Sequence, residues 1–133
     1  MASRRLLLSS LLALEIAASG VSLGAHHSYA AYDREHPVSI EGNIEHVVFA
    51  NPHTILVIRV ADTEYVVEWG SILQLQRSNI AKDTLKVGDR VLVTGSAFRN
   101  QAVHKMSLLT QIRRPADGWV WSRQLPPSIL TEP

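Results

Sequence analysis

The 133-residue chain contains no cysteine, and this absence excludes several kinds of site. Without thiols it can form no disulfide framework, no thiolate zinc site, no iron-sulfur cluster and no cysteine nucleophile. Any bound metal must be held by histidine and carboxylate groups, so imidazole is the main candidate ligand. All six histidines lie beyond residue 24: His26, His27, His36, His46, His53 and His104.

The chain also lacks an excess of charge of either sign. Its formal net charge is +1, and without the first 24 residues it retains 11 basic and 11 acidic residues. Only 6% of the residues are aromatic. A neutral chain of this kind offers no basic groove with stacking aromatics for nucleic acid and no basic field for an anionic membrane. We therefore expect neither partner.

Signals of an enzyme are missing as well. The serines have no nucleophile-elbow context, and no glycine-rich phosphate loop is present. Glu64 and Glu68 alternate with apolar residues, which is typical of the solvent-facing side of a strand. The length leaves room for one core only. We expect a small domain without catalysis.

Residues 1–24 have the layout of a secretory signal peptide. Arg4 and Arg5 precede an apolar run that Glu15 interrupts, and small residues follow. The run is shorter than the ~20 residues a membrane anchor needs, so the mature form should have no span. The arginine pair is also compatible with twin-arginine export. Signal peptidase prefers small residues at the last and third-last positions before the cut, and cleavage after Gly24 or after Gly20 satisfies this preference. Either cut predicts a periplasmic or secreted protein.

The mature chain shows the periodicity of short strands and one helix. A turn at Asn51-Pro52 follows the first strand, and Ser71 is placed to cap the helix. The resulting order is β-β-β-α-β-β, which predicts a mainly β fold with one short helix. This order is typical of a five-stranded OB-fold-like Greek-key barrel. The alternative is a small open α+β sheet. The strands are expected at 38–48, 53–60, 63–69, 90–98 and 102–112, and the helix at 71–79.

The parity of the first strand indicates which side chains face the core. Val38, Ile40, Ile44 and Val48 share one face, and His46 falls on it too, so we expect an inward histidine there. Gly42 suggests a bulge or sharp coil of the kind that closes small barrels. In the third strand, Tyr65, Val67 and Trp69 share one side.

The domain organisation follows from these elements. After the leader we expect a histidine-containing lead-in at 25–37, the barrel at 38–114 and a tail at 115–133. The tail holds four of the six prolines, which predicts that it does not continue the sheet. Trp119 and Trp121 are expected to pack against the barrel.

The densest polar signal lies just after the leader, at His26-His27-Ser28. If Ala25 is the first residue, the amine, two amide nitrogens and the His27 ring can form a square-planar site, a geometry that selects Cu(II) or Ni(II). If His26 is first, its amine and ring can chelate copper together and one further imidazole completes the site. The alternative is a polar lead-in without a ligand.

The second signal is Asn51-Pro52-His53, in the loop between the first two strands. Loops at that end of OB barrels commonly form the binding surface, and a rigid turn would hold the imidazole in one orientation. The alternative for His53 is a strand-start residue whose ring bonds a neighbouring carbonyl. His36 and His104 have no partners at ligand spacing and are expected on the surface.

The chain resembles a family of small exported bacterial proteins of unknown function. The likeness is carried by His26-His27-Ser28-Tyr29, Asn51-Pro52-His53 and the junction Glu68-Trp69-Gly70-Ser71, and it extends to about Ile112. The resemblance implies an exported OB-like domain with no established activity, and it favours His26, His27 and His53 acting together. The tryptophan and proline tail departs from these relatives.

Two functions follow as expectations. The first is a periplasmic binding domain whose His26, His27 and His53 bind a transition metal, copper first, because Cu(II) stands highest in the affinity order for nitrogen sites. The second is an envelope structural or protein-interaction domain that binds no metal.

Overall fold

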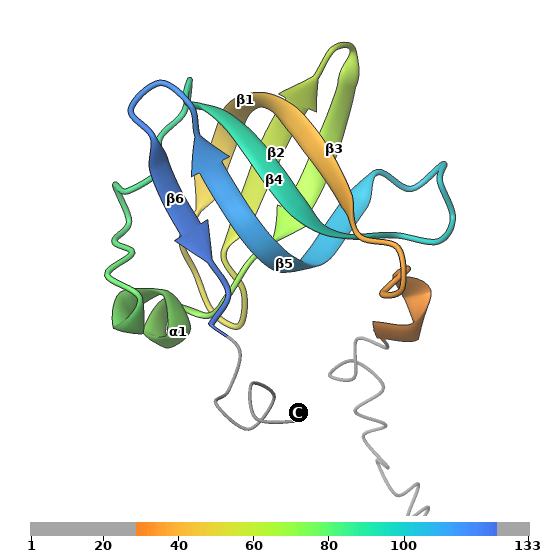
Figure 1. The fold of residues 1–133 in the computed structure, drawn as a ribbon, viewed down its shortest axis with the longest axis horizontal. Coiled ribbons are helices and arrows are strands. Elements are labelled where there is room, and N and C mark those ends of the chain that lie inside the picture. Colours follow the sequence, from red (N-terminus) through yellow and green to blue (C-terminus); the bar gives the residue numbers. More distant parts are fainter. Residues whose placement is uncertain (1–28, 125–133) are drawn as a thin grey trace, which may run out of the picture.

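The computed structural model describes residues 29–124, and these form strands that curve around one core (Figure 1). The predicted strands and helix are all present, with ends shifted by a few residues; the helix, for example, ends at Arg77 and not at Asn79. The elements in chain order are a 3-10 turn η1 (Tyr29–Ala31), β1 (Val38–Val48), β2 (Ile55–Val60), β3 (Thr63–Glu68), α1 (Ile72–Arg77), β4 (Arg90–Ala97), β5 (Lys105–Arg114) and β6 (Trp119–Ser122).

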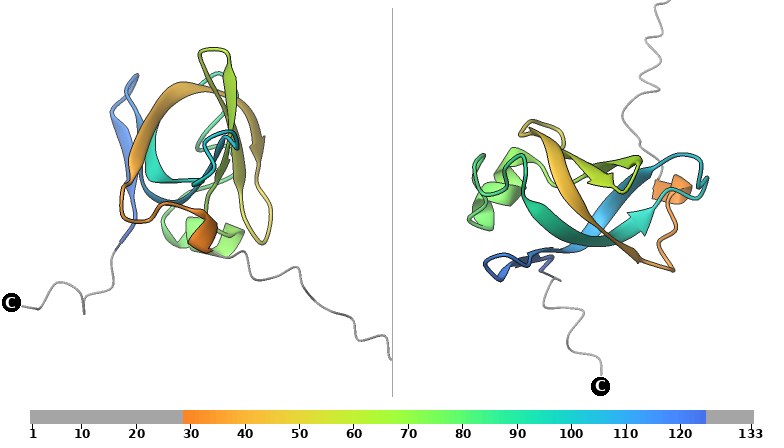
Figure 2. Two further views of the ribbon diagram at one scale, coloured as in Figure 1. Left: turned by 90° about the vertical axis from the view of Figure 1, so that its right-hand side faces the viewer. Right: turned by 90° about the horizontal axis from the view of Figure 1, so that it is seen from above.

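The strand pairing closes the sheet into a barrel. Antiparallel neighbours follow the order β3-β2-β1-β4-β5, and a parallel pairing of β3 with β5 joins the two ends. Figure 2 shows the closed ring of strands from one end. The predicted OB-like barrel is therefore confirmed, and the open α+β sheet is not what forms.

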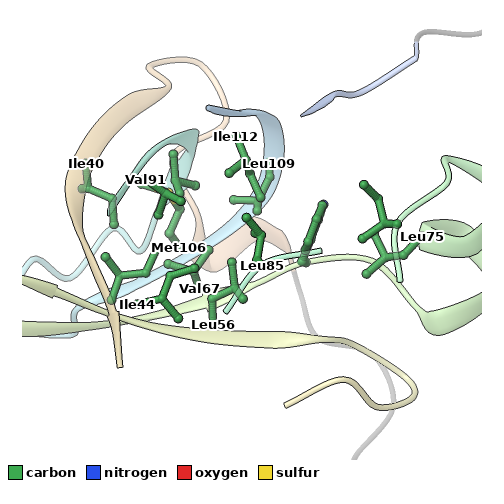
Figure 3. Close-up of a cluster of buried hydrophobic side chains, with 14 residues drawn as sticks. Ile40, Ile44, Leu56, Val67, Leu75, Leu85, Val91, Met106, Leu109 and Ile112 are labelled. Atoms are coloured by element: carbon green, nitrogen blue, oxygen red, sulfur yellow. The ribbon is translucent and has the colours of Figure 1, made fainter. Parts of the chain in front are cut away.

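The core fills the barrel with branched aliphatic side chains from every barrel strand. Alternate residues of β2 and β4 point inward, whereas β5 contributes Met106, Leu109 and Ile112 around an irregularity in its pairing. Leu75 reaches the cluster from α1 (Figure 3). Ser71 caps α1 as predicted, through a reciprocal capping box with Gln74. The fully buried members include Ile44, Leu56, Ile58, Val67, Val91, Val93, Met106, Leu109 and Ile112.

A bulge in β1 overturns the expected orientation of His46. Ile44 lies opposite Ile58, but His46 lies opposite Val57, so one extra residue stands between them. The extra residue inverts the alternation beyond it. His46 and Val48 are exposed, and Val47 packs toward the core in their place. The prediction that His46 and Val48 face inward is wrong for this reason.

The tail also differs from its prediction, because residues 119–122 form a sixth strand. β6 pairs antiparallel with β5, from Gln111 opposite Ser122 to Arg114 opposite Trp119. This is possible because β5 runs past its short pairing with β3 and leaves an open edge, and because the prolines flank β6 without interrupting it. Trp119 and Trp121 pack against the core, as predicted.

Within residues 29–124, no helix combines the length and the apolar character needed to cross a membrane.

Candidate functional site

His53 is held at one end of the barrel by the loop that precedes β2. The Asn51-Pro52 peptide bond is cis, and the Asn51 side-chain oxygen accepts a hydrogen bond from the Ile72 amide at 3.0 Å. Next to His53, the Thr54 amide donates to the Gly70 carbonyl, and the Trp69 amide donates to the Thr54 carbonyl. These bonds extend the β2–β3 hairpin and fix His53 beside the end of β3.

Both ring nitrogens of His53 face oxygen atoms. Nδ1 lies 3.3 Å from the Trp69 carbonyl oxygen, and Nε2 lies 3.2 Å from Oε1 of Glu68. The tautomer decides the roles of these atoms: a proton on Nε2 donates to Glu68, whereas a proton on Nδ1 donates to the Trp69 carbonyl and leaves the Nε2 lone pair facing Glu68. The carbonyl contact offered as the alternative for His53 is thus present, and it is the kind of contact that orients metal-binding histidines.

A cavity of about 350 Å³ opens beside this pair. Trp69 and Trp121 form part of its wall, with ring centroids 5.2 Å apart in an edge-to-face arrangement. The cavity is large enough for a hydrated ion or a small molecule. Its lining also includes Tyr29, His53, Glu68, Gln74, Leu75 and Arg123.

The start of the described chain is tied to the connection between β4 and β5. In the right-hand view of Figure 2, η1 and α1 lie on opposite sides of the barrel. The Tyr32 ring packs edge-on against Phe98, with centroids 5.3 Å apart. Three hydrogen bonds add to this contact: Asp33 N to Ala97 O, Arg99 N to Ala31 O, and Arg99 Nε to Ala30 O. They fix η1, whose first residue, Tyr29, lines the cavity.

Comparison with known proteins places the chain in a family. A family model described as a family of unknown function, DUF6152, matches residues 13–107. The chain belongs to this family. A search of curated proteins found no match. The matched part of this DUF6152 chain includes His26, His27, His53 and Glu68, and it ends within β5, before β6.

The cavity carboxylate Glu68 lies close enough to Tyr32, the residue after η1, to influence its hydroxyl electrostatically. Burial raises the pKa of the Tyr32 hydroxyl, and the charges of Glu68 and Tyr29 raise it further. The Tyr32 hydroxyl therefore stays neutral near pH 7. Glu68 remains the group beside His53 that can neutralise a bound cation.

Of the histidines predicted as metal ligands in this DUF6152 domain, the structure, within residues 29–124, places only one at the cavity. His53 lies at the cavity, whereas His26 and His27 lie outside the described residues. His36 is exposed and pairs with Asp33 at 3.1 Å. His104 is exposed and lies against Tyr65, with ring centroids 5.2 Å apart, so both are surface residues as expected.

Glu68 is the site residue that sequence reasoning missed. Its alternation with Glu64 indicates a solvent-facing residue, yet its side chain is only 18% exposed. The hairpin register could have revealed it. The two-residue turn Ala61-Asp62 sets Ile55 opposite Glu68. Continuing that register sets His53 opposite Gly70, which makes Glu68 its diagonal neighbour on the same face. Among residues 29–124, no cluster of three or more histidines and carboxylates has the arrangement of a metal site.

Proposed function

We propose that this DUF6152 protein is an exported, non-catalytic binding domain for a transition metal, copper(II) first, held by His53 together with His26 and His27. One observation carries the proposal. His53 lies on the wall of a cavity that Tyr29 also lines, and Tyr29 follows the His26-His27 pair by two residues.

The covalent reach of the chain supports this arrangement. Consecutive Cα atoms are ~3.8 Å apart, so the Cα of His27 is within about 7.6 Å of the Cα of Tyr29. The imidazole adds further reach. This covalent limit keeps His27 close to Tyr29, which lines the same cavity as His53.

The chemistry of the donors favours copper. Imidazole and amine nitrogens suit Cu(II), which has the highest affinity of the divalent first-row ions for such sites. Cleavage before His26 would supply an amine and a ring from one residue, and cleavage before Ala25 would supply the amine, amides and the His27 ring. Because protons compete with the metal for these nitrogens, affinity should fall on acidification.

The test uses protein purified from the periplasm. Intact mass locates the first residue, and Cu(II) titration gives stoichiometry and affinity for the wild type and for His26→Ala, His27→Ala and His53→Ala. His104→Ala removes a surface imidazole that the proposal does not use and serves as the control. We expect each site variant to lose copper affinity by at least the roughly 10–100-fold seen when a residue that only supports a ligand is removed, and the control to match the wild type. Copper bound at wild-type stoichiometry in all three site variants would overturn the proposal.

A second candidate, an envelope interaction domain, is supported by β6. Within residues 29–124 this strand is last in the sheet order and pairs with β5 alone, so its other edge can accept a strand from a partner. Wild-type protein that binds no copper in the titration, with unchanged stability in the histidine variants, would favour this candidate.

A further inference from the structure

The carboxylate that faces His53 supports one more inference, which rests on the proposed function. We infer that Glu68 is itself a ligand of the metal, through Oε1, so that the site combines nitrogen donors with one carboxylate oxygen. The inference depends on the geometry of the His53–Glu68 pair and on its place at the cavity.

The separation of the two atoms suits adjacent ligands of one ion. Imidazole nitrogen and carboxylate oxygen bind ions such as zinc at ~2.0–2.2 Å, and two such bonds at roughly 90–110° place the donor atoms about 3.0–3.4 Å apart. The Nε2 to Oε1 distance is 3.2 Å. The pair can therefore bind one ion with little movement of either side chain.

The orientation of the pair agrees with this role. In the tautomer with the proton on Nδ1, the Nε2 lone pair and Oε1 of Glu68 are two acceptors 3.2 Å apart, and a cation bound to both removes their repulsion. A carbonyl behind the ring is the usual contact that fixes a ligating histidine. Because Glu68 and Trp69 are consecutive residues, the end of β3 supplies both the oxygen ligand and the contact that orients the nitrogen ligand.

The surroundings shield the His53–Glu68 pair partly from water. The His53 and Glu68 side chains are 29% and 18% exposed, and both line the cavity. A divalent ion in such a site gains more from one anionic ligand than it would at an open surface, because the interaction is less screened. Glu64, on the same strand, is instead paired with Arg59 at 2.7 Å and is half exposed.

Glu68 can act on the metal in two ways, and they have different signatures. A ligand contributes its oxygen to the coordination sphere, so its loss changes the electron paramagnetic resonance spectrum of Cu(II). A positioning residue only orients His53, and the amide oxygen of glutamine could retain that contact without changing the donor set.

The experiment compares Glu68→Gln and Glu68→His with the wild type, using the full processed protein and Cu(II) alone as the probe. Glu64→Gln is the matched control on the same strand. We expect Glu68→Gln to weaken copper binding by about tenfold or more and to alter the resonance spectrum. Glu68→His should retain copper with a spectrum shifted toward all-nitrogen coordination. Glu64→Gln should leave affinity and spectrum unchanged, and thermal unfolding of the metal-free variants checks that each is folded.

The outcomes separate this inference from the proposed function. If wild type binds copper, His53→Ala weakens binding, and Glu68→Gln keeps the wild-type spectrum, Glu68 is not a ligand and only this inference fails. It fails in the same way if affinity falls while the spectrum stays unchanged, because that result indicates a positioning residue. If wild type binds no copper, or His53→Ala binds as wild type does, both fail together.

Discussion

The size of a single side chain can limit how closely two strands pack, and Gly42 is the clearest case in this barrel. A methyl group at this buried position would overlap the carbonyl oxygen of Arg59 on β2. The glycine thus lets β1 coil closely over β2 just before the bulge that turns His46 outward.

Replacing Gly42 with alanine should destabilise the barrel. The added carbon can be accepted only by moving backbone, and overpacking of this kind costs about 1–3 kcal/mol. Urea unfolding of Gly42→Ala should therefore show a lower midpoint than wild type. Asn43→Ala, at the exposed next residue, is the control and should change the midpoint much less. Equal midpoints for Gly42→Ala and wild type would contradict the close approach described for β1 and β2.

The sequence predicts part of the candidate site at this scale. Asn51-Pro52-His53 stands out because a proline turn before a strand orients the residue that follows. Glu68 does not stand out in the sequence. The period-two alternation of β3 indicates which residues lie on the same face of the strand, but it does not indicate which residue of β2 lies opposite them. The inward expectation for His46 fails because a bulge adds one residue without leaving a mark in the apolar pattern.

At the scale of elements, the strands and the helix are predictable and the sixth strand is not. Alternating or continuous apolar runs bounded by turns locate β1 to β5, and Ser71 marks the start of α1. β6 is short, lies among prolines, and forms because Arg114 holds the turn before it. The Arg114 guanidinium donates to Asp117 at 2.8 and 3.0 Å and to Asp89 at 2.9 Å. Hydrogen bonds of this kind between side chains do not produce a repeating pattern of apolar residues, so the sequence does not predict them.

The contact between Arg114 and Asp117 makes the stability of this turn depend on pH. Hydrogen bonding from Arg114 holds the pKa of Asp117 below its ordinary value of 3.8. A lowered native pKa means that the stabilisation is complete above the unfolded-state value and is lost as the pH falls through the native value. Asp117→Asn should therefore be less stable than wild type at about pH 5–7, and the difference should shrink below about pH 3.8.

Urea unfolding of both proteins across this pH range checks the prediction. Glu35→Gln removes an exposed carboxylate ahead of β1 and serves as the control, with a smaller difference from wild type at neutral pH. A difference between Asp117→Asn and wild type that stays constant down to about pH 2 would be inconsistent with the charged contact.

At the scale of the whole molecule, barrel closure brings residues distant in sequence to one cavity. The β2–β3 hairpin sets His53 beside Glu68, and the contacts of η1 with the β4–β5 connection set Tyr29 at the same cavity. Element order favours the closed barrel over an open α+β sheet, because a three-strand, helix, two-strand chain of this length matches a known topology. Which side chains share a cavity depends on register and on the anchoring of η1, which element order does not specify.

The most direct test of the metal site is a crystal structure of the periplasm-purified protein loaded with Cu(II), with anomalous scattering recorded at the copper edge. We predict one copper peak at the cavity, within bonding distance of His53 Nε2 and of a histidine from the start of the processed chain. A peak elsewhere, or one bound only by residues of the chain start with His53 remote from it, would contradict the proposed site.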